Sequence, residues 1–186
     1  WLMERVGGGR CPIINLSGGT EVGACFLSPT PLTPLKPGSL GKPCFGMSVE
    51  VWDPQTGERL GPGDGVGELV CTKPWPAMTR GVWKDPERYL ETYWSRWPDV
   101  WVHGDWASID EDGFWFLHGR SDDTLNIAGK RIGPAEIESA AVALDEVMMA
   151  AAIGLPDDVK GESIALYMVP APGVDPDDDL SARVSD

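Results

Sequence analysis

Residues 101–138 read WVHGDWASIDEDGFWFLHGRSDDTLNIAGKRIGPAEIE, and the rest of the chain is organised around this stretch. Apolar and polar residues alternate in 100–109 and again in 114–117, on either side of the acidic, glycine-containing turn 110–113. Two alternating segments joined by such a turn predict a β-hairpin. Further on, Pro134 follows Gly133, and proline fits the first position of a helix, where its missing N–H is not needed. The stretch therefore predicts two antiparallel strands, an exposed charged joint, a glycine turn and a helix.

Charged residues gather at the joint that follows the hairpin. Arg120 is followed by the acidic pair Asp122 and Asp123, and Arg131 comes after the glycine turn. A carboxylate at the end of a strand can accept from two sugar hydroxyls at once, and arginines suit phosphate oxygens because their charge is permanent and their donors are forked. This chemistry indicates nucleotide binding at a joint between two lobes.

The order and spacing of these residues carry a family resemblance. The pattern GD-x4-DEDGF-x4-GR-x-DD-x-LN-x2-G-x-R-x4-EIE resembles the adenylate-forming enzymes that include the AMP-forming acyl-CoA synthetases, and within them the acetyl-CoA synthetase branch. The likeness extends from about residue 14 to residue 169. It implies an α+β fold: residues 1–121 would be the end of a large N-terminal domain with a β-rich, barrel-like subdomain, and residues 122–186 a hinge and a small, incomplete α+β C-terminal lobe.

A second motif precedes the first one. Small residues after a strand let backbone N–H groups approach an anion, and a threonine hydroxyl adds a donor. Alone, the sequence Gly18-Gly19-Thr20-Glu21 indicates an ordinary loop more often than a phosphate site. Ahead of the central stretch it resembles the Y-G-x-T-E motif of the family, which implies that Thr20 contacts the adenylate phosphate and that Glu21 helps to hold Mg²⁺.

This motif departs from the family at two positions, Ser17 and Gly18. The resemblance nevertheless assigns both residues, together with Gly19, to the site that binds the nucleotide and the acyl group. Ser17 stands where the family has an aromatic residue beside the adenine, and Gly18 stands where acetate and propionate enzymes have a tryptophan that closes the acyl pocket. Removing an indole opens space on the order of a hundred cubic ångströms, judged from the area that an aromatic side chain fills. We therefore expect an acyl group larger than acetyl.

The resemblance assigns further roles to residues of the central stretch. Asp105, in the sequence His-Gly-Asp, would bind the ribose hydroxyls, and Arg120 would contact the ribose as well. Asp122 would be the hinge about which the small lobe rotates between two half-reactions. Gly129 would line the path of the pantetheine arm of coenzyme A, where a side chain would block the tunnel. Arg131 would reach the adenylate phosphate and, with Thr20 and Glu21, belong to the catalytic set.

The remaining chain is interpreted as scaffold. Residues 11–16 are expected to form a short buried strand, and the proline-rich segment 28–43 to be mostly irregular. Residues 47–52 and 66–71 are expected to pair as strands, and a helix is expected at 85–93, with Asp85 as its N-cap. The aromatic residues around this helix are expected to pack under the barrel, and strands are expected at 148–155 and 163–169. The histidines, His103 and His118, are expected at strand surfaces, and Ile137, Ala140, Ala141 and Leu144 on one helical face.

Composition limits the partners. The formal net charge of −14 argues against a nucleic-acid or anionic-membrane surface. No signal peptide and no 18-residue apolar run is present, so a cytoplasmic location is expected. The four cysteines lack metal-ligand spacing and are expected to be buried or half-buried free thiols.

Two elements of the family do not appear in the sequence: a Ser/Thr/Gly-rich phosphate loop with its lysine ahead of Thr20, and a P-K-T-x2-G-K segment after Val169. The expectation is a fragment, inactive alone, whose partner is the remainder of its own chain. The whole enzyme would activate a small carboxylic acid with ATP and transfer the acyl group to coenzyme A, through an acyl-adenylate that becomes AMP. Two alternatives stay open. One is an amino-acid-activating domain of a peptide synthetase, which usually has lysine in place of Asn126 and glutamate in place of Gly133; the other is a non-catalytic module.

Overall fold

The structure, a computed structural model, describes residues 1–127, 130–157, 159 and 161–175. It divides into two compact units, Trp1–Leu117 and His118–Asp186, whereas the sequence placed a boundary after residue 121. Strands predominate and helices are few, so the mixed α+β class is confirmed. Within the described residues, no helix is long and apolar enough to cross a membrane.

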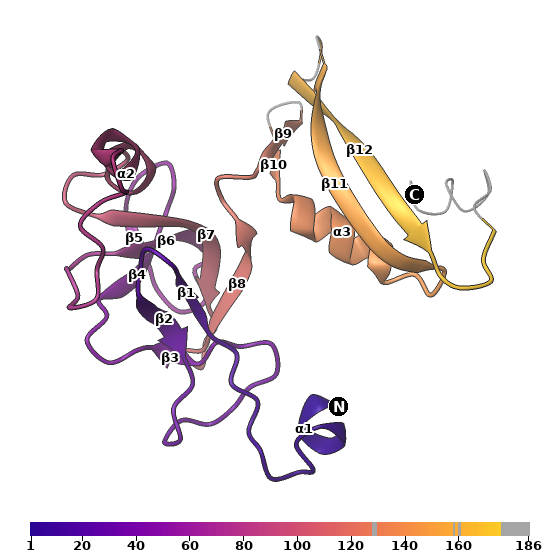
Figure 1. The fold of residues 1–186 in the computed structure, drawn as a ribbon, viewed down its shortest axis with the longest axis horizontal. Helices are drawn as coiled ribbons and strands as arrows, with labels where there is room; N and C mark the ends of the chain where they lie inside the picture. Colours follow the sequence, from indigo (N-terminus) through magenta and orange to yellow (C-terminus); the bar gives the residue numbers. More distant parts are fainter. Residues whose placement is uncertain (128–129, 158, 160, 176–186) are drawn as a thin grey trace. The chain divides into compact units, whose positions relative to one another are not determined.

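The first unit contains two antiparallel sheets (Figure 1). The three-stranded sheet has the order β1-β2-β3, and the five-stranded sheet has the order β5-β4-β6-β7-β8. The predicted pairing of the segments near 47–52 and 66–71 is confirmed, with Val49 opposite Cys71, and the hairpin around turn 110–113 is confirmed as β7 and β8. The strands are β1 (Ser17–Gly19), β2 (Ala24–Ser28), β3 (Lys42–Pro43), β4 (Val49–Trp52), β5 (Arg59–Leu60), β6 (Val66–Cys71), β7 (Trp101–Ile109) and β8 (Trp115–Arg120).

An aromatic core supports β7 from one side. Helix α2 (Pro86–Trp94) begins as predicted, because the Asp85 carboxylate accepts from the backbone N–H of Arg88 at 3.1 Å. The Tyr93 ring stacks on the fully buried Trp101 indole of β7, with the centroids 4.0 Å apart and the planes 9° from parallel. The aromatic residues in and around this helix pack against one another and against neighbouring strands, as predicted. Trp83 is the exception, because it is 86% exposed.

The segment ahead of β1 differs from the prediction. A short helix, α1 (Leu2–Arg5), is followed by residues 11–16, which are exposed and form no strand. Ser17 is the first residue of β1 and lies opposite Leu27. The neighbouring strand ends one residue later, at Ser28, because the prolines that follow cannot donate to a ladder. Residues 11–16 therefore have no strand to pair with in β2.

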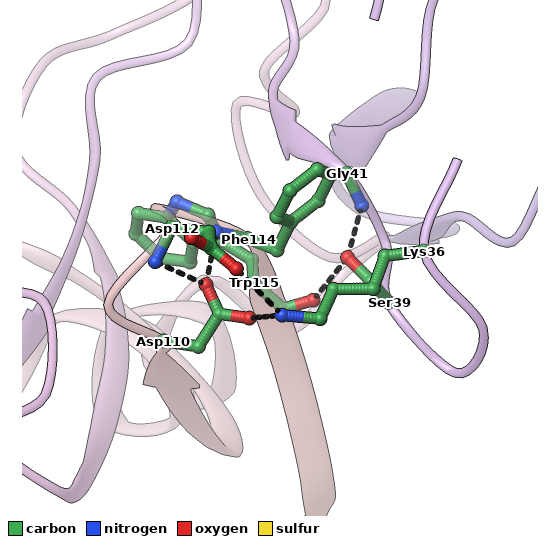
Figure 2. Close-up of polar contacts among 7 residues, drawn as sticks. All are labelled: Lys36, Ser39, Gly41, Asp110, Asp112, Phe114 and Trp115. Atoms are coloured by element: carbon green, nitrogen blue, oxygen red, sulfur yellow. Dashed lines mark hydrogen bonds and ion pairs between the residues drawn. The ribbon is translucent and has the colours of Figure 1, made fainter. Parts of the chain in front are cut away.

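The proline-rich segment is mostly irregular, as predicted, apart from Ser28 at the end of β2 and the two residues of β3. It is anchored to the β7–β8 hairpin (Figure 2). The Lys36 ammonium contacts the carboxylates of Asp110, at 2.5 Å, and Asp112, at 3.1 Å. The Ser39 hydroxyl donates to the backbone oxygen of Trp115 at 3.1 Å. The hydrogen bond from Lys36 is the largest cause that lowers the pKa of the Asp110 carboxyl, and the hydrogen bonds to Asp110 and Asp112 raise the pKa of Lys36.

The second unit is a four-stranded sheet with one helix. The sheet has the order β10-β9-β12-β11, and α3 (Pro134–Val142) packs along β11 (Figure 1). The buried side chains of Ala141 and Ala152 lie at this interface, where the Glu138 carboxylate accepts from the Ala152 N–H at 2.9 Å. Of the residues predicted to share one helical face, Ala141 is buried and Ala140 is exposed. The strands are β9 (Leu125–Ile127), β10 (Lys130–Ile132), β11 (Val147–Asp157) and β12 (Gly161–Pro170); the last two confirm the prediction.

All four cysteines are free thiols. Cys11 is exposed, contrary to the expectation of burial, because it lies in the unpaired segment ahead of β1. Cys71 is buried at the end of β6, and this burial raises the pKa of its thiol.

Candidate functional site

The Gly-Gly-Thr-Glu motif covers the end of β1 and the start of the turn that leads to β2. Gly23 closes this turn: its N–H donates to the backbone oxygen of Gly19 at 3.1 Å, and its φ of +61° favours glycine. The Trp75 indole N–H donates to the Val22 oxygen at 2.7 Å, and the Thr79 N–H donates to the Glu21 oxygen at 3.2 Å. The backbone of the turn is thus held at two points by the segment 75–79.

The side chains of this turn are accessible. Thr20 is exposed and Glu21 is half-buried. A rigid backbone that presents one hydroxyl and one carboxylate can bind a phosphate and the cation that accompanies it. Magnesium is commonly held by one or two carboxylates together with substrate phosphates, and Glu21 fits that donor set. Among the described residues, no group of three His, Cys, Asp or Glu side chains could hold a metal by itself.

Asp105 lies in a β-bulge of β7. Glu68 of β6 pairs with Trp106 and Val70 pairs with Val102, so the residues 103–105 of β7 lie opposite the single residue between Glu68 and Val70. Bulges re-aim side chains and are frequent beside functional sites. Gly104, inside the bulge, has a φ of +82°, a conformation that a residue with a side chain rarely adopts. The bulge brings the His103 Nε2 to 3.6 Å from the Asp105 Oδ2, with both residues buried.

His103 brings the two parts of the site in the first unit together. A Cβ added to Gly19 would lie 3.3 Å from the His103 Cε1, so the ring packs directly against β1. The Phe26 ring of β2 meets the imidazole edge-on, with the centroids 4.9 Å apart and the planes at 84°. The structure thus brings the Gly19-Thr20-Glu21 turn beside the His103-Gly104-Asp105 bulge.

The prediction that His103 lies at a strand surface is wrong, because the bulge turns its side chain inward. His118 is exposed, as expected. The only sequence signal for His103 was its position directly ahead of the Gly-Asp pair. Trp75 and Thr79, which hold the turn, carried no signal in the sequence.

Ser17 and Gly18 lie in β1 itself. Ser17 is buried, and a Cβ added to Gly18 would lie 2.2 Å from the backbone oxygen of Ala24 on β2. No side chain fits at residue 18 unless the two strands move apart. Close strand approach is therefore a second physical reason for glycine at this position, beside the size of an acyl pocket.

The other predicted residues lie in the second unit, which begins at His118, within β8. Arg120 and Asp122 form a bidentate ion pair, with the Arg120 Nε 2.8 Å from Oδ1 and Nη2 2.5 Å from Oδ2. Both side chains are about half exposed, at 46% and 57%. Arg131 belongs to β10, where its backbone pairs with Asn126; its side chain and all of Gly129 lie outside the described residues. The assignments of Arg120, Asp122, Gly129 and Arg131 stay predictions.

Two family models match this chain, one within each of its two units. The family model for the AMP-binding enzymes matches residues 1–83, and the model for the AMP-binding enzyme C-terminal domain matches residues 136–186. The chain belongs to the AMP-binding enzyme family. The two matches, in this order, confirm the family predicted from the central stretch and the Gly-Gly-Thr-Glu motif.

Individual relatives are acyl-CoA synthetases. The chain is 44% identical to an acetyl-coenzyme A synthetase of Rubrobacter xylanophilus, over 99% of this chain and 28% of the relative. It is 41% identical to an acetyl-coenzyme A synthetase of Methanothrix thermoacetophila, over 100% of this chain and 28% of the relative. It therefore spans about 28% of the length of these relatives.

Solved structures that resemble this one include two acyl-CoA-forming enzymes. The acetoacetyl-CoA synthetase of Streptomyces lividans has a TM-score of 0.80 and 37% identity, over 99% of this chain and 28% of that one. An anthranilate CoA ligase in complex with anthranoyl-AMP has a TM-score of 0.71 and 27% identity, over 92% of this chain and 32% of that one.

Proposed function

We propose that the protein carrying this chain is an AMP-forming carboxylate–CoA ligase. It would activate a carboxylic acid with ATP to an acyl-adenylate, release pyrophosphate, and transfer the acyl group to coenzyme A. The 186-residue chain is expected to be inactive alone, because the sequence carries neither the phosphate-loop lysine nor the C-terminal lysine of the family.

One observation carries the proposal. Within the first unit, the Thr20-Glu21 turn lies beside the Asp105 bulge, joined through the contact between Gly19 and His103. A hydroxyl and a carboxylate for the phosphate end, next to a second carboxylate for sugar hydroxyls, fit a nucleotide. The relatives named acetyl-coenzyme A synthetase support the same class of reaction.

Each side chain would have a distinct role. Asp105 accepts from the ribose hydroxyls and so fixes the nucleotide. The Thr20 hydroxyl donates to an oxygen of the α-phosphate, and the Arg131 guanidinium offsets charge that develops there as the carboxylate attacks. Glu21 would hold Mg²⁺, which supplies further positive charge at the phosphates. Arg120 adds a ribose contact, Asp122 lets the small lobe rotate, and Gly129 leaves room for the pantetheine arm.

We further propose an acyl group larger than acetyl. The solved relative from Streptomyces lividans is named for acetoacetate, a four-carbon acid, and Gly18 leaves open the place of an indole. Other relatives are named for acetate, so the two possible acyl sizes must be distinguished by experiment. The close approach of β1 and β2 at Gly18 means that a tryptophan there would also require a different hairpin geometry.

The test is pyrophosphate release by the full-length ligase with ATP, Mg²⁺ and acids from acetate to octanoate, including acetoacetate, with and without coenzyme A. Turnover that depends on coenzyme A, and that is faster with four-carbon acids than with acetate, is the expected result. The Asp105→Asn variant should raise the KM for ATP, whereas Glu111→Gln, at the exposed hairpin turn, should not.

Other results would decide against the proposal. Preference for acetate would refute the proposed acyl size but would still support the assignment as a carboxylate–CoA ligase. Activity with amino acids and no CoA product would indicate a peptide-synthetase adenylation domain. A folded protein that is inactive with every acid would indicate a non-catalytic module.

A further inference from the structure

We propose that His103 is a positioning residue for the nucleotide, which holds the Asp105 carboxylate in the orientation that binds the ribose. The inference rests on the proposed function, in which Asp105 is the ribose ligand. It adds a residue that neither composition nor motif had selected for any role in the site.

Only some orientations of the carboxylate suit the ribose hydroxyls. The terminal torsion of an aspartate side chain has a broad energy profile, so a carboxylate can rotate through a wide range of orientations. The His103 Nε2 lies 3.6 Å from one oxygen, Oδ2, and the side chains are 9% and 12% exposed. A small rotation of either group converts this contact into a hydrogen bond from an Nε2–H. With Oδ2 directed at the imidazole, Oδ1 would be the oxygen that accepts from the sugar hydroxyls.

The imidazole is itself fixed on several sides. The Phe26 ring stands perpendicular to it, Gly19 of β1 lies against its Cε1 edge, and Gly104 shapes the bulge that aims it inward. A residue larger than glycine at position 19 would press on the ring. The ring thus lies against Gly19, next to Thr20 at the phosphate end of the site, and beside Asp105 at the ribose end.

Packing alone would explain a buried aromatic ring at this position, and two variants separate packing from positioning. His103→Phe keeps a ring against Phe26 and Gly19 and removes the N–H donor. His103→Gln loses the ring and keeps an amide N–H at a reach similar to that of Nε2. If His103 serves only packing, His103→Phe should impair the enzyme less than His103→Gln does. If His103 positions the carboxylate, His103→Gln should impair ATP binding less than His103→Phe does.

The assay is steady-state pyrophosphate release by the full-length ligase, with the concentrations of ATP and of the carboxylic acid varied separately. His103→Phe should raise the KM for ATP about tenfold, which corresponds to about 1.4 kcal/mol. Its kcat and its KM for the acid should stay within about twofold of wild type, a change of less than about 0.5 kcal/mol. His103→Gln should keep the KM for ATP within about threefold of wild type, and so rescue the loss. His118→Phe, at the exposed histidine, is the matched control and should behave as wild type.

Three results would overturn the inference: a wild-type KM for ATP in His103→Phe, a KM in His103→Gln raised as far as in His103→Phe, or a loss confined to kcat. If His103→Phe does not fold, His103→Asn replaces it, because its shorter amide cannot reach Oδ2; the same rise in KM is expected, and a wild-type KM again refutes the idea. Asp105→Asn in the same assay separates the two proposals. If it raises the KM for ATP while His103→Phe does not, the ribose role stands and only the positioning role fails.

Discussion

Breaking the ion pair between Arg96 and Glu68 should be among the most destabilising single changes in the first unit. The Glu68 side chain on β6 is fully buried, and its carboxylate lies 2.6 Å from the Arg96 Nη1. Arg96 also donates to the backbone oxygen of Pro54 at 3.1 Å and lies 4.5 Å from the centre of the Trp97 ring. Arg96→Met keeps most of the side-chain stem and leaves the carboxylate inside the protein without this cation.

The expected loss follows from burial. Removing one partner of a buried ion pair costs about 3–5 kcal/mol, because the remaining charge is left desolvated. The Arg96 side chain is 33% exposed, so water already weakens the attraction, and we expect about 3 kcal/mol, the lower end of that range. Glu68→Met combined with Arg96→Met removes both charges and should recover about 1–2 kcal/mol relative to Arg96→Met alone.

The same sheet offers a control of the same chemistry. Arg59 lies 3.9 Å from Glu50, and its side chain is 69% exposed. Arg59→Met should therefore cost about 0.5 kcal/mol or less. The measurement is urea unfolding of the chain at neutral pH, followed by far-UV circular dichroism, with the free energies compared at equal m. The reasoning is refuted if Arg96→Met costs no more than Arg59→Met, or if the double variant is less stable than Arg96→Met.

Three further changes test other contacts. Because the pKa of the Asp110 carboxyl is lowered in the folded protein, its pairing with Lys36 contributes its full stabilisation above the ordinary carboxyl pKa of about 4, and less as the pH falls through the folded pKa. The stability advantage of wild type over Lys36→Met, measured by thermal melting, should therefore shrink below about pH 4. A difference that stays constant with pH would contradict the pairing. Gly18→Ala should destabilise the first unit by about 1–3 kcal/mol, because its Cβ collides with the backbone of the facing strand; unchanged urea unfolding would show that the strands separate easily. Iodoacetamide at neutral pH should modify the exposed Cys11 well before Cys71, which is buried and whose thiol pKa is raised; mass spectrometry of timed samples gives the order, and modification of Cys71 first would contradict its burial.

Local sequence predicted the elements whose cause is local. Asp85 followed by Pro86 indicated the start of a helix, and the turn at 110–113 indicated the hairpin, because caps and turns depend on adjacent residues. The family pattern predicted the Gly-Gly-Thr-Glu motif as part of a site, and the structure brings it beside Asp105.

Features that depend on distant residues were missed. Residues 11–16 look like a strand, but the absence of a ladder partner is decided by Pro29, in the neighbouring segment. The burial of His103 depends on a bulge defined by its pairing with β6, which no short pattern reveals. In each case the decisive neighbour lies on another element.

The fastening of the proline-rich segment sets an order of events during synthesis. Lys36 and Asp110 are 74 residues apart in the chain, so the segment leaves the ribosome long before the hairpin that holds it. At about 5–20 residues per second, this interval lasts about 4–15 s. During this interval the segment is not yet bound to the hairpin and can contact other chains. Its prolines make such contacts less dangerous, because proline cannot donate a hydrogen bond to an intermolecular β-ladder. The prolines that keep this segment irregular in the folded protein thus also protect it before folding.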